Sequence, residues 1–283
     1  MNGFINLYKP SGMSSAYALS LIKRRFKGEK IGHMGTLDPL ASGVLPVAFG
    51  KSTRLFDFLL EKTKVYKANF TFSYETDTLD RGGKIIKENG LIPTREDIEK
   101  VLSRLVGSVE QLPPIYSAKN VNGKRSYELA RSGVEVELKP KTVYIESIKL
   151  TNVIDSKTYE FIIECKGGTY IRSICRDMAY ALNTYATMTA LERLESGIFT
   201  KENSFTLEEI TENFNIEKML IKPDTVVNLD IINLSKRKFD DVINGRPCSL
   251  DFADGFYKVY GENEFLGIGK ITDKNLKIKA FIK

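Results

Sequence analysis

The sequence predicts an α+β protein with one large and one small domain. Over roughly the first 228 residues, segments with strand character alternate with a few amphipathic helical segments. From about residue 231 to 283 the pattern changes to closely spaced short strands. A chain of 283 residues is long enough to bury both cores. We therefore expect one domain over residues 1–228, with an elaboration at about 75–140, and a second over residues 229–283.

The first expected elements are a strand and a helix. Residues 4–8 alternate in hydropathy as a strand does, and residues 9–12 supply turn chemistry at its end. Ser14 or Ser15 can cap a helix whose apolar side chains recur every three or four residues. Cations on its other face either complement the helix dipole or contact phosphate groups; they are Lys23, Arg24 and Arg25, with Lys27 and Lys30 beyond.

Further strands and capped helices are expected along the chain. The strands lie at residues 69–74, 142–150, 159–165, 256–260, 265–271 and 276–282. Thr94 opens a capping box for a helix that stops by Gly107, and residues 206–209 form a second capping box. Thr169 can cap a helix over residues 171–182. A short helix containing Phe239 precedes the last strands.

The composition restricts the possible chemistry. Lys and Arg number 42 against 36 Asp and Glu, which gives a net charge of +6 and favours a polyanionic partner without proving one. The three cysteines are widely spaced and form no CxxC pair, and there is one histidine. We therefore expect reduced thiols in a cytoplasmic protein, with no disulfide framework and no metal site. A membrane-spanning helix needs about 18 consecutive apolar residues, and no stretch of the sequence approaches that length. The N-terminus also lacks the layout of a signal peptide.

One stretch, residues 30–50, has the features of a reactive site. It contains four glycines and two prolines around a single carboxylate, Asp38, so its backbone must bend or be approached closely. An Asp before Pro39 can simply cap a turn. However, the apolar run at residues 44–49 is typical of a buried strand. Asp38 would then lie on a loop at the mouth of a sheet, where reactive groups are often placed.

The sequence GHMGTLDPLASGVLP at residues 32–46 closely resembles the catalytic motif of the TruB family, the tRNA pseudouridine-55 synthases. The resemblance covers essentially the whole chain and is also strong at residues 9–15, 113–131 and 168–199. It implies a pseudouridine synthase catalytic fold with a large, mainly antiparallel mixed sheet, followed by a small, mostly-β, PUA-like domain that binds RNA. It also implies conversion of a uridine in the tRNA T arm to pseudouridine. That isomerisation gains and loses no atoms, so no cofactor is expected.

The resemblance assigns catalytic roles residue by residue. Asp38 matches the essential catalytic residue, and Tyr66 matches the tyrosine that stacks on the target base. In the motif at residues 168–173, Tyr170 lies at the reacting base and Arg172 pairs with Asp38. From the residues alone, Tyr66 could be a core aromatic and Arg172 part of a structural ion pair. An Arg at a helix N-terminus does need a nearby anion, because the helix dipole is unfavourable there.

Five further residues are expected to bind the substrate: His33, Leu191, Lys9, Lys119 and Arg125. His33 would help to hold the flipped base, or it is a hydrogen-bonded loop histidine. Leu191 matches the pocket-lining leucine of the family, and Lys9 lies in the family's first motif. Lys119 and Arg125 belong to runs that interleave aromatic and cationic residues, a mixture that stacks bases and neutralises phosphates.

Three positions depart from the family pattern. Ala179 and Asn183 stand where the family usually has glycine, and Thr187 stands where a histidine is common. Alanine suits a helix, and asparagine is the next best residue after glycine for a left-handed helix cap. We therefore expect the helix and its end to be preserved.

In the expected mechanism the target base is flipped into a pocket, and Asp38 acts as a nucleophile or as a base at the sugar. Attack at C6, attack at C1′ and a glycal intermediate all remain open. Two other functions fit the sequence: a non-catalytic RNA-binding or tRNA-folding factor, and a guide-RNA-dependent synthase, which shares the motifs. Because the sequence shows no long basic N-terminal extension and its C-terminal domain is short, we expect a stand-alone enzyme rather than a guided one. We also expect a monomer that acts on tRNA without a protein partner.

Overall fold

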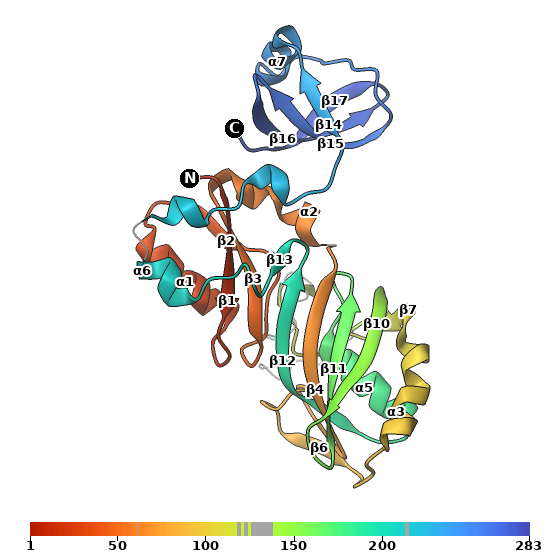
Figure 1. Cartoon of the computed structure of the whole chain (residues 1–283). Helices are drawn as coiled ribbons and strands as arrows, with labels where there is room; N and C mark the ends of the chain where they lie inside the picture. The colour runs from red at the N-terminus through yellow and green to blue at the C-terminus, as the bar shows by residue number, and fades with distance from the viewer. Residues whose placement is uncertain (61, 118–119, 122–123, 126–137, 213–214) are drawn as a thin grey trace.

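The computed structural model describes residues 1–283 except 61, 118–119, 122–123, 126–137 and 213–214 (Figure 1). A nine-stranded sheet and a four-stranded sheet organise it, and two short hairpins, β5–β6 and β8–β9, stand apart. The large sheet has the order β1-β3-β12-β4-β11-β10-β7, with β2 added to β3 and β13 added to β12. Among these strand pairs only β12 and β3 run parallel. The α+β class and the large, mainly antiparallel mixed sheet are confirmed.

The predicted strands are present, although the one expected at residues 69–74 is β4, which begins and ends earlier, at Lys64–Phe72. The strands of the large sheet are β1 (Gly3–Lys9), β2 (Ile31–His33), β3 (Ser42–Phe49), β4 (Lys64–Phe72), β7 (Gly107–Gln111), β10 (Lys141–Val153), β11 (Thr158–Cys165), β12 (Ala186–Ser196) and β13 (Phe199–Thr200). The hairpins are β5 (Tyr74–Thr76) with β6 (Ile85–Glu88), and β8 (Asn120–Val121) with β9 (Lys124–Arg125). Because β7 extends the large sheet beside β10, the segment at 75–140 is partly built into that sheet.

The helices are short and lie around the sheets. They are α1 (Ser15–Arg25), α2 (Phe56–Leu60), α3 (Arg95–Leu102), α5 (Ile171–Ala181), α6 (Leu207–Glu212) and α7 (Lys236–Ile243), with 3-10 turns η1 (Gly50–Leu55), η2 (Ser103–Leu105), η3 (Ile216–Met219) and η4 (Pro223–Thr225). In Figure 1, α3 and α5 accompany the half of the sheet that contains β11 and β10, while α1 and α6 lie near β1. Among the described residues, no helix combines the length and apolar character needed to cross a bilayer.

The helix-end signals read from the sequence are confirmed at four places. Ser14 caps α1 by accepting a backbone N–H, and Thr94 and Asp97 form a reciprocal capping box at α3. Thr206 shares the same reciprocal bonds with the side chain and backbone of the residue three positions later. Asn183, just beyond α5, has a φ of 55° and so takes the left-handed conformation expected of it.

Two local predictions differ from the structure. The N-cap of α5 is Tyr170 rather than Thr169, whose hydroxyl donates instead to the carbonyl of Lys166 at 2.9 Å. Strand β12 was not predicted, because its sequence, ATMTALERLES, is rich in helix-forming Ala, Leu and Glu. Pairing with β4 on one side and β3 on the other outweighs that local preference, since β propensity depends mainly on such context.

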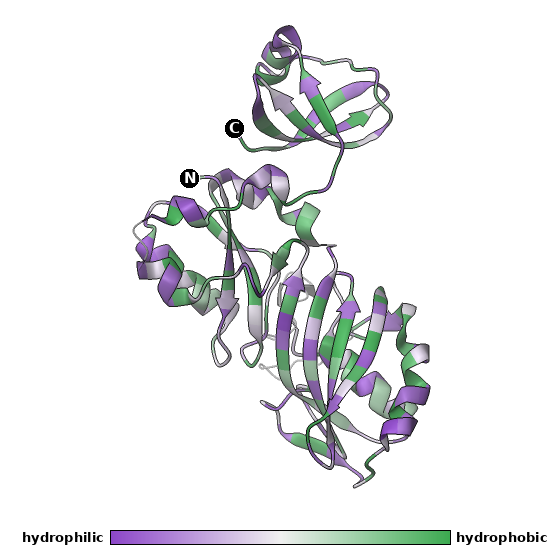
Figure 2. Ribbon diagram, viewed as in Figure 1, coloured by the Kyte–Doolittle hydropathy of each residue, from purple (hydrophilic) through white to green (hydrophobic). Residues whose placement is uncertain are grey.

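Alternation along the strands gives the large sheet its core. Residues of β4 and β11 alternate between buried and partly exposed positions, and Figure 2 shows hydrophilic and hydrophobic residues interleaved along the strands of this sheet. The Phe70 and Phe161 rings lie with their centroids 4.8 Å apart in this core. Helix α5 adds Ile174, Cys175 and Met178, at helical spacing, to the same cluster. The core therefore fixes α5 against the strands that carry the candidate site.

A four-stranded sheet forms the C-terminal part. Its strands are β14 (Ile231–Leu234), β15 (Gly255–Gly261), β16 (Glu264–Thr272) and β17 (Asn275–Phe281), in that order. It has its own apolar cluster, which includes Phe239 of α7. It also contacts the first part of the chain, where Arg54 Nη1 donates to the Phe281 carbonyl at 2.6 Å and Asn2 to the Ile282 carbonyl at 3.1 Å. The small C-terminal β sheet is thus confirmed.

Glu192 links three elements on the face of the sheet opposite Tyr66. Its carboxylate accepts from the Tyr8 hydroxyl at 2.7 Å and lies 2.6 Å from Lys201 Nζ and 2.9 Å from Lys67 Nζ. Burial acts to raise the pKa of Glu192, but hydrogen bonds from the two lysines and Tyr8 outweigh it and lower that pKa from 4.5 to about 2. The carboxylate is therefore more acidic in the folded protein than in the unfolded chain.

Glu192→Gln is expected to lower the free energy of unfolding at pH 7 by about 2 kcal/mol, less than the full pKa shift implies because both lysines are partly exposed. Since the folded pKa lies below the unfolded one, this stabilisation is present above about pH 4.5 and is lost as the pH falls toward 2. Urea unfolding from pH 7 down to pH 3 measures it. Glu195→Gln, an exposed change on the same strand, is the control. An equal deficit for Glu192→Gln at every pH would contradict the prediction.

Candidate active site

Asp38 lies on the loop between β2 and β3, and that loop is fixed by backbone contacts. Ser15 Oγ both donates to the Leu37 carbonyl and accepts from the Leu37 N–H, each at 2.9 Å. The Ala41 N–H closes a turn on the Asp38 carbonyl at 3.0 Å. Leu37 and Ala41 are buried, whereas the Asp38 side chain keeps 31% of its surface exposed. The loop therefore holds a partly accessible carboxylate on a rigid support.

Arg172, the second residue of α5, makes the central contact of the site. Its Nε lies 3.0 Å from Asp38 Oδ2, and its Nη2 donates to Asp38 Oδ1 at 3.1 Å. The remaining N–H groups donate to the carbonyls of Thr78 and Tyr116, both at 3.0 Å. The side chain is only 6% exposed. Arg172, the predicted partner of Asp38, thus bonds to both carboxylate oxygens. This fixes the orientation of the carboxylate and favours its charged form.

Asp80 is a second carboxylate of the site, and the sequence did not indicate that it takes part. Its Oδ2 lies 3.5 Å from Arg172 Nη1, while its Oδ1 accepts from the Thr78 hydroxyl and the Gly82 N–H, each at 2.9 Å. Within this turn Leu79 has a φ of 60°, a conformation that non-glycine residues adopt only when their surroundings impose it. Here a backbone bond from the Met188 N–H to the Leu79 carbonyl contributes, at 3.2 Å.

The charges around Asp38 act in opposite directions on its acidity. Burial raises the pKa of the Asp38 carboxyl, Arg172 lowers it, and the nearby Asp80 carboxylate raises it; the net direction is upward. Asp38 is therefore a stronger base than an ordinary aspartate, and it is also held in one orientation by Arg172. Both properties suit a carboxylate that attacks a sugar or accepts a proton.

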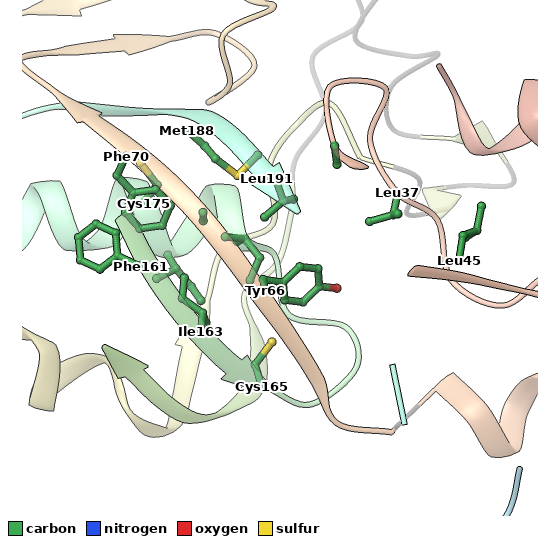
Figure 3. Close-up of a cluster of buried hydrophobic side chains, with 14 of the residues drawn as sticks. Leu37, Leu45, Tyr66, Phe70, Phe161, Ile163, Cys165, Cys175, Met188 and Leu191 are labelled. Atoms are coloured by element: carbon green, nitrogen blue, oxygen red, sulfur yellow. The ribbon is translucent and has the colours of Figure 1, made fainter. Parts of the chain in front are cut away.

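Tyr66 and Leu191 lie side by side on one face of the sheet. Tyr66 comes from β4, and Leu191 from β12, where it pairs with Ala68 two positions further along β4. Both are buried, and burial raises the pKa of the Tyr66 hydroxyl. In Figure 3 the Tyr66 hydroxyl points toward the segment that carries Leu37, with Leu191 above the ring. The structure therefore brings the predicted stacking tyrosine and pocket leucine together beside the Asp38 loop.

Tyr170 is held at the start of α5 by a side chain from the edge of the sheet. Gln111 of β7 accepts from the Tyr170 N–H at 2.8 Å and donates to its carbonyl at 3.1 Å. The Tyr170 side chain is half-buried and lies two residues before Arg172. These two bonds replace the side-chain cap that the N-terminus of α5 lacks.

His33 and Lys9 have environments that the sequence did not indicate. Burial is the main cause that lowers the pKa of His33, so the ring is neutral near pH 7. Its buried Nδ1 finds no hydrogen-bond partner among the residues that the structure describes. Lys9 is fully buried, and its Nζ donates to the carbonyls of Pro10, Met13 and Ala41 at 2.8, 2.6 and 2.5 Å. All three donors of Lys9 are thus used inside the protein. Lys9 thereby joins the turn after β1 to the Asp38 loop, and its expected contact with the substrate stays a prediction.

The other two expected substrate contacts lie on the segment after β7. Lys119 lies outside the described residues, and so does the Arg125 side chain, although the Arg125 backbone belongs to β9. Within the described part of the chain, no three His, Cys, Asp or Glu side chains gather as a metal ion would require. The described chemistry of the site therefore consists of carboxylates, tyrosines and cationic side chains.

Three family models match the sequence in succession. "TruB family pseudouridylate synthase (N terminal domain)" matches residues 23–171. "tRNA pseudouridylate synthase B C-terminal domain" matches residues 172–227, and "Pseudouridine synthase II TruB, C-terminal" matches residues 231–279. The first match alone spans more than half of the chain and contains the Asp38 loop.

Curated relatives match over the full length. The tRNA pseudouridine synthase B of Clostridium perfringens (strain 13 / Type A) is 38% identical and covers 100% of this chain and 99% of its own. That of Clostridium novyi (strain NT) is 41% identical with 100% coverage of both. That of Clostridioides difficile (strain 630) is 39% identical and covers 99% of this chain and 98% of its own.

Solved structures of similar shape include chains of two multi-component complexes. A chain of "Crystal Structure of a Cbf5-Nop10-Gar1 Complex" superposes with a TM-score of 0.74 at 24% identity, covering 99% of this chain and 84% of that chain. A chain of the "Structure of H/ACA RNP bound to a substrate RNA containing 2'-deoxyuridine" gives a TM-score of 0.71 at 23% identity, with coverage of 99% and 84%. At these identities the likeness establishes the fold alone.

The opposing charges around Asp38 predict that its pKa shifts in opposite directions in two variants. Arg172→Met should raise the pKa of Asp38 further, because a partly buried carboxylate loses its cation. Asp80→Asn should lower that pKa, because a neighbouring negative charge is removed. Titration of the aspartate side-chain carboxyl ¹³C resonances by NMR measures both. Asp155→Asn, an exposed change in a distant turn, should leave Asp38 unaffected. Shifts in the same direction for the first two variants would contradict the charge arrangement described above.

Proposed function

The chain belongs to the TruB family of pseudouridine synthases and is therefore an isomerase, and we propose that it converts one specific uridine in the T arm of tRNA to pseudouridine without a guide RNA. The observation that carries this proposal is the two-bond pair between Asp38 and Arg172 beside the wall formed by Tyr66 and Leu191. The full-length matches to curated tRNA pseudouridine synthases support tRNA as the substrate.

The proposed reaction begins when the target uridine leaves the RNA stack. A base inside folded RNA cannot reach Asp38, so it is flipped into the pocket, where Tyr66 stacks on it and Leu191 forms a wall. Asp38 then acts at the ribose or at the base, the glycosidic bond breaks, the uracil turns, and a carbon–carbon bond replaces the carbon–nitrogen bond. Arg172 holds the Asp38 carboxylate ionised and aimed throughout.

The other site residues have supporting roles in this proposal. Tyr170 lies at the start of α5, beside Arg172, where it can handle the proton released from C5 of the rearranged base. His33 ends β2, just before the Asp38 loop, and it is neutral near pH 7, so it can hold the flipped nucleotide without adding charge. Lys119 and Arg125 neutralise RNA phosphates. Lys9 supports the Asp38 loop from within.

The wider organisation follows the same proposal. Residues 1–228 form the catalytic domain, with the elaboration at about 75–140, and residues 229–283 form a PUA-like RNA-binding domain. Family models that end at 227 and begin at 231 support this division. The protein acts in the cytoplasm as a monomer that needs no protein partner. The three free cysteines, all buried, support a reducing compartment.

A guide-RNA-dependent synthase is the second candidate. The observation that favours it is the superposition on chains from H/ACA complexes, but that likeness concerns the fold alone. A non-catalytic RNA-binding or tRNA-folding factor would retain RNA affinity without isomerisation. The experiments below separate these alternatives from the stand-alone enzyme.

Tritium release from a tRNA transcript labelled at C5 of its uridines tests the reaction directly. With no guide RNA present, the unmodified protein should release tritium, and Asp38→Asn should lower the single-turnover rate by about 10³-fold or more, because the reacting carboxylate is removed. Asp155→Asn should match the unmodified protein. If neither the unmodified protein nor Asp38→Asn released tritium while both bound tRNA, the stand-alone proposal would fail.

The position of the product tests the substrate assignment. An isolated T stem-loop should be modified at one uridine, and primer extension after carbodiimide treatment should stop at that position. An anticodon stem-loop of equal length should show no stop, because recognition depends on the folded T arm. Modification of the anticodon stem-loop, or of several positions, would contradict the proposed specificity.

A further inference from the structure

Arg81 is an exposed cation beside the pair of Asp38 and Arg172, and the proposed reaction has given it no role. It follows Asp80, whose Oδ2 lies 3.5 Å from Arg172 Nη1 and whose side chain is only 12% exposed. Arg81 itself is exposed to solvent. Its side chain forms no ion pair and no hydrogen bond with any residue that the structure describes. The turn thus presents one residue to the buried guanidinium and the next to solvent, at the edge of the site.

The turn that carries Arg81 joins β5 to β6 and is held by bonds of its own. The Asp77 N–H donates to the Lys84 carbonyl at 3.0 Å, and Asp77 Oδ1 accepts from the Lys84 N–H at 2.9 Å. The Gly83 N–H donates to the Asp80 carbonyl at 3.2 Å. A Cβ at Gly83 would meet Asp77 Oδ1 at 2.3 Å, so a larger residue there would displace these bonds. The backbone of Arg81 therefore has a fixed position.

Strand β12 fixes the same turn relative to the wall of the pocket. The Arg81 N–H donates to the Met188 carbonyl at 3.1 Å, and the Met188 N–H donates to the Leu79 carbonyl at 3.2 Å. Met188 lies on the strand that also carries Leu191. Because backbone groups make these bonds, the Arg81 guanidinium is not needed to hold the turn. It is left available to a partner from outside the protein.

Other cations close to the site already have partners within the protein. Lys87, on β6 of the same hairpin, lies 2.8 Å from Glu75 Oε1. Arg176, on α5, lies 2.8 Å from Asp177 Oδ1. Arg81 differs from both, because its positive charge is uncompensated and faces solvent. A guanidinium matches phosphate oxygens in geometry as well as in charge, so a phosphate group of RNA is the ligand that its chemistry fits.

We propose that Arg81 binds a phosphate group that flanks the flipped uridine. When the uracil occupies the pocket with its glycosidic bond at Asp38, the adjoining phosphates stay at the edge of the site, because they join this nucleotide to the rest of the RNA. Arg81 lies at that edge, one residue beyond the contact of Asp80 with Arg172. A phosphate contact positions the nucleotide and does not read its base. The role rests on the proposed function, because it assumes that the uridine is flipped toward Asp38.

Neutralising single phosphates of a synthetic T stem-loop tests this contact. Methylphosphonate linkages replace, one at a time, the two phosphates that flank the target uridine, and filter binding gives the Kd in an Asp38→Asn background that prevents turnover. With Arg81 present, one of the two replacements should weaken binding about 10-fold, the loss expected for a hydrogen bond to a charged group. In Arg81→Met the same replacement should weaken binding by less than about 3-fold, because the partner is already absent. Equal losses in both proteins would overturn the proposal.

The salt dependence of binding gives a second measurement. Arg81→Met should reduce the slope of log Kd against log salt concentration by about 0.7 to 0.9, the value for one lost phosphate contact. Arg104→Met is the matched control, because Arg104 is another exposed arginine without an ion pair among the described residues, and it should leave the slope unchanged. Arg81→Lys keeps the charge but not the planar fork, so it should retain the slope and lose part of the affinity. An unchanged slope for Arg81→Met would overturn the proposal.

Failure of this inference is distinguishable from failure of the proposed function. If the chain were not a stand-alone synthase, the unmodified protein would release no tritium from the labelled tRNA. If only the role of Arg81 were wrong, the unmodified protein would release tritium, and Arg81→Met would respond to the methylphosphonate linkages as the unmodified residue does.

Discussion

The ion pair between the partly exposed Asp38 and the buried Arg172 is the interaction on which the site depends. Its partners are 134 residues apart, one on the loop before β3 and one at the start of α5. Removing two charges from water is unfavourable unless every remaining hydrogen-bonding group finds a partner. Here the carbonyls of Thr78 and Tyr116 complete the guanidinium. The sheet, α5 and the turn after β5 must therefore all be in place before the pair is stable, so the fold and the reactive group are coupled.

Much of the fold could be predicted because many of its signals are local. Ser14 and Thr94 cap helices with their own side chains, and Asn183 takes the left-handed conformation that ends α5. Strand β12 could not be predicted, because its stability comes from β3 and β4, which lie far away in the sequence. Thr169 does not cap α5 for a similar reason: the side chain of Gln111, which lies far away in the sequence, binds the backbone of Tyr170 instead.

For the site, the motifs identified which residues matter but not what their atoms contact. The pairing of Arg172 with Asp38 followed from the resemblance, and the geometry agrees with it. Lys9 also lies in a family motif, but the motif does not show what its ammonium contacts. Three carbonyls surround it, and nothing in the neighbouring sequence indicates that the Ala41 carbonyl is one of them. The contact of Asp80 with Arg172 was missed because it arises from loop packing, which becomes visible only when the chain is folded.

The buried side chains near Tyr66 carry an excess of positive charge, which has a consequence for the chemistry of the site. Arg193, Lys9 and Lys64 are buried on this side of the site, and the two lysines have pKa values lowered to about 8. Near pH 7 such amines remain mostly protonated, so the interior carries positive charge that opposes folding. Negative charge develops on uracil as its glycosidic bond breaks, and a fixed positive environment stabilises that charge without reorganisation. In the proposed reaction, the cations that disfavour the folded protein by itself would favour both the RNA substrate and its transition state.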